Sequence, residues 1–194
     1  ESGAFIDTGD EGRPDIQINV LPLLTGDVDR EPLPGHGVTL NPCQLRPYSR
    51  GEVTLRSSDP ADPILFDGRY LSDDRDIDAM VRGLKAARTI LRQPSLAGLT
   101  KGEILPSPQA DVPDRALADH VRNYAKTVYH PSGTCRMGSD VNAVVDTKLR
   151  VQGVRNLRVC DASVMPKLIS GNTNAPTIMI ASRCADFILA QENT

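Results

Sequence analysis

Alternating hydrophobic and polar positions open the chain. Between residues 15 and 21, three β-branched residues alternate with polar ones, and this period of two predicts a strand with one covered face. Similar short runs at 2–6, 38–45 and 51–56 predict further strands, the last two joined as a hairpin over 46–51. Such alternation is typical of an antiparallel sheet whose second face is wet or lines a cavity.

A helical period replaces the alternation further along. From Ile77 to Leu91, apolar residues recur every third or fourth position opposite Arg and Lys, which predicts an amphipathic helix. Capping residues at 72–76 mark its beginning, and Pro94 marks its end. A second helix is predicted from Asp114 and leads toward Val128.

The last third of the chain has a different pattern. Short apolar runs near 144–151 and 157–160 predict small strands, and a largely apolar, buried helix is predicted to begin near Pro176. We place a boundary near residues 125–145. One strand and one apolar helix cannot close a core alone, so this final segment is short of packing partners.

Composition and charge narrow the class of protein. With 39% hydrophobic and 24% charged residues the chain is ordinary globular protein, and a net charge of −3 with no basic stripe argues against nucleic acid as a partner. It has no run of 18 apolar residues and no signal-peptide pattern. We therefore expect a cytoplasmic protein without a transmembrane segment, with peripheral membrane contact left open. Because it does not begin with Met, we interpret it as a fragment or a processed product.

The cysteines point to no metal. Cys43, Cys135, Cys160 and Cys184 form no CxxC pair and match no zinc spacing. They lie within otherwise regular apolar segments. We expect buried free thiols in a reducing compartment and no metal site.

Two stretches carry candidate chemistry. The first, YHPSGTCRMG, holds His130 in a short loop after a helical pattern. The second comprises VCDASVMP and SGNTNAPTIMIASRCADFI, which are predicted to form a strand, an irregular loop and the start of a helix carrying an Asn. A histidine and such a strand–loop–helix are candidates for two polar groups that converge on one ligand.

These motifs closely resemble the C-terminal part of the glucose–methanol–choline (GMC) oxidoreductases, which are FAD-dependent alcohol oxidases and dehydrogenases, and in particular their choline-dehydrogenase-like branch. The resemblance covers essentially the whole chain, and its specific motifs occur in the family's order. It implies an α+β fold. Residues 1–130 would form the substrate-binding domain, mostly an antiparallel sheet with helices on one face. Residues 131–194 would form the active-site loop and the C-terminal strand and helix of an FAD-binding α/β domain, whose remainder is absent, since no GxGxxG occurs here.

The resemblance also implies catalytic roles. It places His130 over the flavin face, where an imidazole, which titrates near neutral pH, takes the hydroxyl proton of an alcohol. It assigns orientation of the substrate oxygen to Asn174, because an amide is no base at neutral pH. Read from the residues alone, His130 is also explained as a helix-terminal histidine, and Asn174 as a helix N-cap.

Five further residues are implied to bind FAD. Asp161 and Ala162 match the family's segment along the ribityl and pyrophosphate groups. Ala175, Pro176 and Thr177 begin the last helix, whose positive end suits the negative N1–O2 edge of a reduced flavin. By itself, Asp161 is equally well explained as a residue that makes a local turn.

The implied partners are a small-molecule alcohol and, in the complete enzyme, FAD and the missing N-terminal FAD-binding part. A hypothesis of a different class is that the isolated chain is a non-catalytic substrate or interaction module. A serine-hydrolase interpretation of Ser132, His130 and Asp161 is disfavoured because the chain has no GxSxG elbow.

Overall fold

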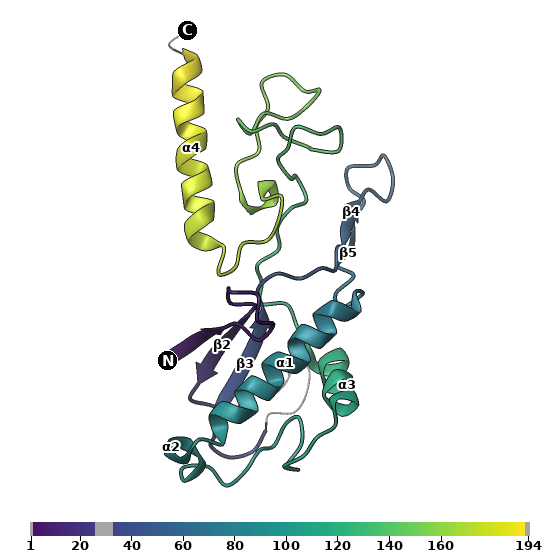
Figure 1. Ribbon diagram of the computed structural model, residues 1–194. Helices are drawn as coiled ribbons and strands as arrows, with labels where there is room; N and C mark the ends of the chain where they lie inside the picture. Colours follow the sequence, from purple (N-terminus) through teal and green to yellow (C-terminus); the bar gives the residue numbers. More distant parts are fainter. Residues whose placement is uncertain (1, 26–32, 193–194) are drawn as a thin grey trace. The chain divides into compact units, whose positions relative to one another are not determined.

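The computed structural model describes residues 2–25 and 33–192 and divides into two compact units (Figure 1). Unit 1 comprises Glu1–Arg50 and Arg69–Val128, and unit 2 comprises Gly51–Gly68 and Tyr129–Thr194. The chain therefore passes between the units after Arg50, after Gly68 and after Val128. Helices and antiparallel strands together make it an α+β protein.

Unit 1 is built on a three-stranded antiparallel sheet in the order β1-β2-β3. The strands are β1 (Ser2–Ile6), β2 (Ile16–Leu21) and β3 (Thr39–Gln44), which confirms the strands expected at 2–6, 15–21 and 38–45. The expected hairpin over 46–51 is wrong, because the strand that follows pairs elsewhere, in unit 2. Pro42 lies within β3, opposite Ile18 in the ladder.

Helix α1 (Asp74–Leu91) covers one face of this sheet (Figure 1). Ile16 and Ile18 are fully buried and pack with Ala87 of α1. The helix comes so close that a Cβ added at Gly83 would lie 3.0 Å from Pro42 Cβ. Gly83 therefore allows the contact between helix and sheet.

Helix α3 (Asp114–Tyr124) packs against α1. Leu117 and Val121 are buried with Ile77 and Val81, one helical turn apart on each helix. Along the chain, the single turn α2 (Pro94–Ala97) and a loop connect α1 to α3. Pro94 thus begins a short helix as well as ending α1. The contacts between α1 and α3 form the second apolar cluster of unit 1.

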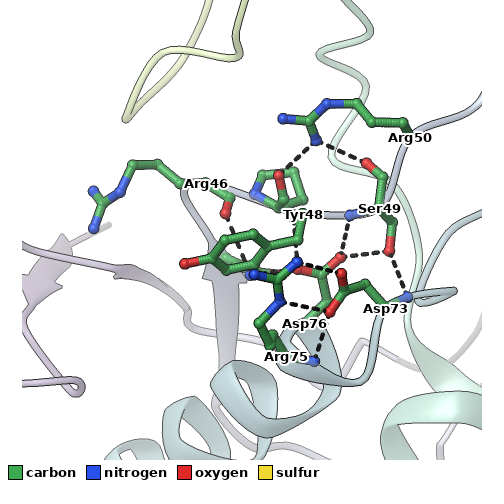
Figure 2. A network of polar contacts seen from close by, with 9 residues as sticks. Arg46, Tyr48, Ser49, Arg50, Asp73, Arg75 and Asp76 are labelled. Carbon is green, nitrogen blue, oxygen red and sulfur yellow. Dashed lines mark hydrogen bonds and ion pairs between the residues drawn. The ribbon is translucent and has the colours of Figure 1, made fainter.

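A buried carboxylate joins the end of the sheet to the first turn of α1 (Figure 2). Asp76 is 1% exposed, and its two oxygens accept hydrogen bonds from Gln44 Nε2 (2.8 Å), Tyr48 N (2.7 Å), Ser49 N (2.8 Å) and Ser49 Oγ (2.5 Å). Burial raises the pKa of Asp76, but the hydrogen bonds from Ser49, Tyr48 and Gln44 outweigh it, so the net shift is downward. The charged side chain thereby fixes residues 44–49 against α1.

Unit 2 has little regular secondary structure before its last helix. Strands β4 (Glu52–Thr54) and β5 (Leu65–Asp67) form an antiparallel pair, and η1 (Ala162–Val164) is a single 3₁₀ turn. The expected strand at 157–160 is wrong: only Arg158 takes part in a bridge, to Arg150. The expected strands near 144–151 are likewise isolated bridges.

Helix α4 (Asn174–Glu192) supplies one wall of the core of unit 2. Ile180 and Cys184 are buried with Val145 and Val164. The expected burial of this helix holds for one side only, since apolar residues on its other faces are exposed, Ile178 by 62%. The described residues cover one side of this helix, and its exposed sides carry apolar residues as well as the ion pair of Arg183 and Asp186.

Two sequence expectations concern the whole chain. The described cysteines are free, as expected, but burial holds only for Cys184, whereas Cys160 is exposed. Among residues 2–25 and 33–192, no helix is both long enough and apolar enough to cross a bilayer.

Candidate functional site

His130 follows a backbone position that bulky residues rarely adopt. Tyr129 has a φ of 63°, in the left-handed region, so the chain turns sharply just before the imidazole. After it, Cys135 N donates to Ser163 O (3.0 Å) and Met137 N donates to Val164 O (2.8 Å). These bonds tie the loop to η1 and fix the place of His130 in unit 2.

The backbone of the loop is left-handed at Gly133. Its φ is +90°, and an added Cβ would lie 3.3 Å from Met165 O. The left-handed backbone is therefore the main reason for a glycine here, whereas the Cβ contact would need only a small local shift. The HPSGT segment thus has a structural reason for its glycine, independent of any chemistry.

The imidazole of His130 is held at both ring nitrogens. Thr173 Oγ1 lies 2.8 Å from Nδ1, and Asn172 Nδ2 lies 2.9 Å from Nε2. Both partners come from the segment that enters α4. The structure therefore brings together the two stretches that the sequence singled out, at a half-buried histidine.

The asparagine beside the imidazole is Asn172. Asn174, the sequence candidate, is exposed and is the first residue of α4. The predicted helix start near Pro176 was two residues late, because α4 begins at Asn174. Sequence reasoning missed Asn172 and Thr173, although both lie inside the quoted motif, because three polar residues stand in a row there.

The cofactor candidates lie at two turns of unit 2. Asp161 Oδ1 accepts from Ser163 N (2.8 Å) and Ser163 Oγ (2.5 Å), so this carboxylate caps η1, beside half-buried Ala162. Ala175 is exposed, and Thr177 Oγ1 donates to Thr173 O (2.7 Å). The local-turn explanation of Asp161 is thus realised in the fold, which leaves a role toward a ligand open.

A serine-hydrolase triad does not form from these residues. The ring nitrogens of His130 contact Thr173 and Asn172, while the Asp161 carboxylate contacts Ser163. A hydrolase would need the nucleophile on one nitrogen and the carboxylate on the other. The interpretation is therefore rejected.

Comparison with protein families identifies the architecture that holds this site. The family model described as GMC oxidoreductase matches residues 47–181, which include His130 and the start of α4. The chain belongs to the GMC oxidoreductase family. The match confirms the family that the sequence motifs indicated, and it covers most of the chain.

Two curated GMC relatives illustrate the likeness. An alcohol dehydrogenase (acceptor) of Pseudomonas putida is 48% identical over 190 residues, 97% of this chain and 34% of the relative. An oxygen-dependent choline dehydrogenase of Acinetobacter baumannii is 42% identical over 195 residues, 99% of this chain and 35% of the relative. The chain thus spans about a third of the length of these relatives.

Solved structures show the same arrangement of elements. Pyridoxine 4-oxidase from Mesorbium loti matches with a TM-score of 0.83 and 31% identity over 95% of this chain and 36% of that one. A formate oxidase of Aspergillus oryzae matches with a TM-score of 0.84 and 28% identity over 96% of this chain and 33% of that one. The α+β fold described here is therefore that of GMC oxidoreductase structures.

Proposed function

We propose that this chain is the C-terminal portion of an FAD-dependent oxidoreductase that oxidises an alcohol to an aldehyde or ketone. The observation that carries the proposal is the His130 imidazole, held between Thr173 and Asn172 in a member of the GMC family. The names of its relatives, alcohol dehydrogenase and choline dehydrogenase, support the same class of donor.

In this proposal His130 is the base. Its Nε2 takes the proton of the substrate hydroxyl while the oxygen keeps the electron pair of the broken O–H bond. Bound FAD supplies the acceptor for the hydride that leaves the α-carbon. The proton and the hydride together account for the two hydrogens that the alcohol loses.

An asparagine amide orients the substrate oxygen. Asn174 is the candidate from the family resemblance, but the geometry favours Asn172, whose Nδ2 lies 2.9 Å from His130 Nε2. A hydroxyl that approaches Nε2 takes the lone pair that Asn172 now occupies. The released amide N–H can then donate to the oxygen on which negative charge develops.

Features at the start of α4 support a flavin site there. The first-turn N–H groups of Asn174 and Ala175 have no acceptor within α4, and the Ala175 side chain is small and exposed. We propose that Ala175, Pro176 and Thr177 meet the negative edge of the reduced isoalloxazine ring. We propose that Asp161 and Ala162 lie along the ribityl and pyrophosphate groups.

The remaining assignments concern the two halves of the chain. We propose that residues 1–130 form the substrate-binding domain. We also propose that the polar face of its sheet, with Gln17 and Asn19, contributes to the substrate-binding cavity of the complete enzyme. Residues 131–194 belong with the remaining FAD-binding part of the same enzyme. The exposed apolar side of α4 supports this, because such a helix needs a partner.

A non-catalytic module is the second candidate. It is favoured by one observation: each unit has a buried apolar cluster of its own. Such a module would bind no flavin and turn over no alcohol.

The test is an absorbance scan across the flavin bands of the complete enzyme, followed by anaerobic addition of primary alcohols such as choline and benzyl alcohol. We expect bound FAD whose bands bleach with at least one alcohol. Bound FAD that no alcohol reduces, while dithionite reduces it, would contradict alcohol oxidation. Absence of FAD from the folded enzyme would favour the module.

A further inference from the structure

Thr173 occupies the position just before α4. Its carbonyl oxygen accepts from Thr177 N (3.0 Å) and from Thr177 Oγ1 (2.7 Å), so its backbone already belongs to the first helical turn. The residue is buried, with 8% of its surface exposed. Thr173 is therefore the N-cap residue of α4.

The hydroxyl of Thr173 lies against the imidazole. An N-cap hydroxyl ordinarily accepts from the N–H of the second or third helical residue. Here the third helical residue is Pro176, which has no N–H. The Thr173 Oγ1 lies 2.8 Å from His130 Nδ1.

The second ring nitrogen decides the direction of this hydrogen bond. The atom of Asn172 that faces Nε2 is the amide nitrogen, which donates and cannot accept. Nε2 must therefore accept, with its lone pair free of a proton. A neutral imidazole carries one proton, so that proton lies on Nδ1 and is donated to Thr173 Oγ1.

We propose that Thr173 is a positioning residue that holds the proton of neutral His130 on Nδ1 and thereby presents Nε2 as the atom that takes the hydroxyl proton. The inference rests on the proposed function, because it assigns the base nitrogen of that reaction. The inference concerns the orientation and the tautomer of the His130 ring, and it assigns their control to the side chain of Thr173, the N-cap residue of α4.

The proton balance follows from this arrangement. The alcohol O–H bond breaks, its proton forms a new N–H bond at Nε2, and the oxygen keeps the electron pair. The imidazolium that results has N–H groups at both nitrogens, and Thr173 Oγ1 accepts from the one at Nδ1. Because the charged ring donates more strongly than the neutral one, this acceptor stabilises the product of proton transfer more than the reactant.

Two substitutions in the complete enzyme test the role. Thr173→Val keeps the shape of the side chain and removes the acceptor, whereas Thr173→Ser keeps the hydroxyl. Thr89→Val is the control for the loss of a threonine hydroxyl elsewhere in the protein, because Thr89 lies in α1 and its Oγ1 donates to Lys85 O (2.9 Å). Bound FAD, measured from its absorbance, and the thermal midpoint show whether each variant folds.

The kinetic readout is anaerobic flavin reduction by a saturating alcohol as a function of pH. We expect Thr173→Val to lower the maximal rate about tenfold, typical for one lost hydrogen bond, with the apparent substrate Kd within about twofold. The acid limb of the pH–rate profile of Thr173→Val should move to lower pH, because the imidazolium loses a hydrogen-bond acceptor. Thr173→Ser should recover the rate to within about threefold, and Thr89→Val should match the wild type.

A second readout is the ¹⁵N spectrum of the His130 ring in enzyme labelled at histidine, assigned by the peaks that vanish in His130→Gln. At a pH where the ring is neutral, we expect the proton on Nδ1 in the wild type and in Thr173→Ser, and a mixture of tautomers in Thr173→Val. The wild-type proton on Nε2 would overturn the proposal.

The outcomes separate this inference from the proposed function. If Thr173→Val lowers only the thermal midpoint, with rate, acid limb and tautomer unchanged, Thr173 is a helix cap alone and the inference is overturned. If His130→Gln retains the wild-type rate of flavin reduction, the proposed function itself fails. A slow His130→Gln beside a normal Thr173→Val therefore rejects the positioning role and keeps the base.

Discussion

At the scale of single residues, the site depends on which polar atoms reach the His130 ring. Sequence motifs were enough to single out His130, because the stretch YHPSGTCRMG holds a single histidine. They were not enough to choose among Asn172, Thr173 and Asn174. That choice depends on where α4 begins, and Pro176 is compatible with several first-turn positions.

The two asparagines make a prediction at this scale. In the complete enzyme, we expect Asn172→Ala to slow anaerobic flavin reduction by about tenfold to a hundredfold, because an N–H donor to the developing alkoxide is lost. Asn174→Ala, made in the exposed first position of α4, should have the smaller effect. Stopped-flow absorbance of both variants checks this. A larger loss in Asn174→Ala would return the orienting role to the residue that the sequence motif indicated.

At the scale of elements, regular hydrophobic periods in the sequence predicted the local secondary structure well. The strands at 2–6 and 15–21 and the helix from Asp74 follow from patterns of two and of three to four. Strand β5 escaped prediction because it is three residues long and lies among turn-forming residues. Its pairing with β4 crosses a loop that no local pattern encodes, and for this reason the expected hairpin at 46–51 was wrong.

The Asp76 network gives the prediction at this scale. In Asp76→Asn an amide NH₂ group replaces one of the two carboxylate oxygens. It then faces the hydrogen-bond donors of that oxygen, which are either Gln44 Nε2 and Tyr48 N or Ser49 N and Oγ. We expect a loss of about 2–3 kcal/mol in the free energy of unfolding, typical of hydrogen bonds to a buried charge. Asp78→Asn, on an exposed residue of the same helix, should stay within about 0.5 kcal/mol. Urea unfolding at pH 7 measures both.

The same carboxylate has a defined pH dependence. Because the pKa of Asp76 is lowered in the folded protein, the unfolded chain binds more protons in the acid range. The stabilisation is fully present above the ordinary aspartate pKa of about 4, and is lost as pH falls through the pKa of the folded protein. The gap between wild type and Asp76→Asn should therefore shrink below about pH 4. A gap that widens in acid would contradict this assignment.

At the scale of the whole molecule, the chain is two units whose boundary crosses the sequence three times. The sequence pattern of one strand and one apolar helix indicated that the last segment was short of packing partners. The structure agrees in one respect: α4 buries Ile180 and Cys184 but exposes Ile178 and Leu189. The sequence predicted the helix but not its exposure, because an apolar period does not state which faces are covered by the same chain.

The central claim is that His130 takes the proton of an alcohol in a flavoenzyme, and the rate of anaerobic flavin reduction tests it most directly. In the complete enzyme we expect His130→Ala to retain its FAD and to be reduced by a saturating alcohol about 10²–10⁴-fold more slowly than the wild type, the usual contribution of a positioned base. Flavin reduction at the wild-type rate, with FAD bound in both proteins, would contradict the account.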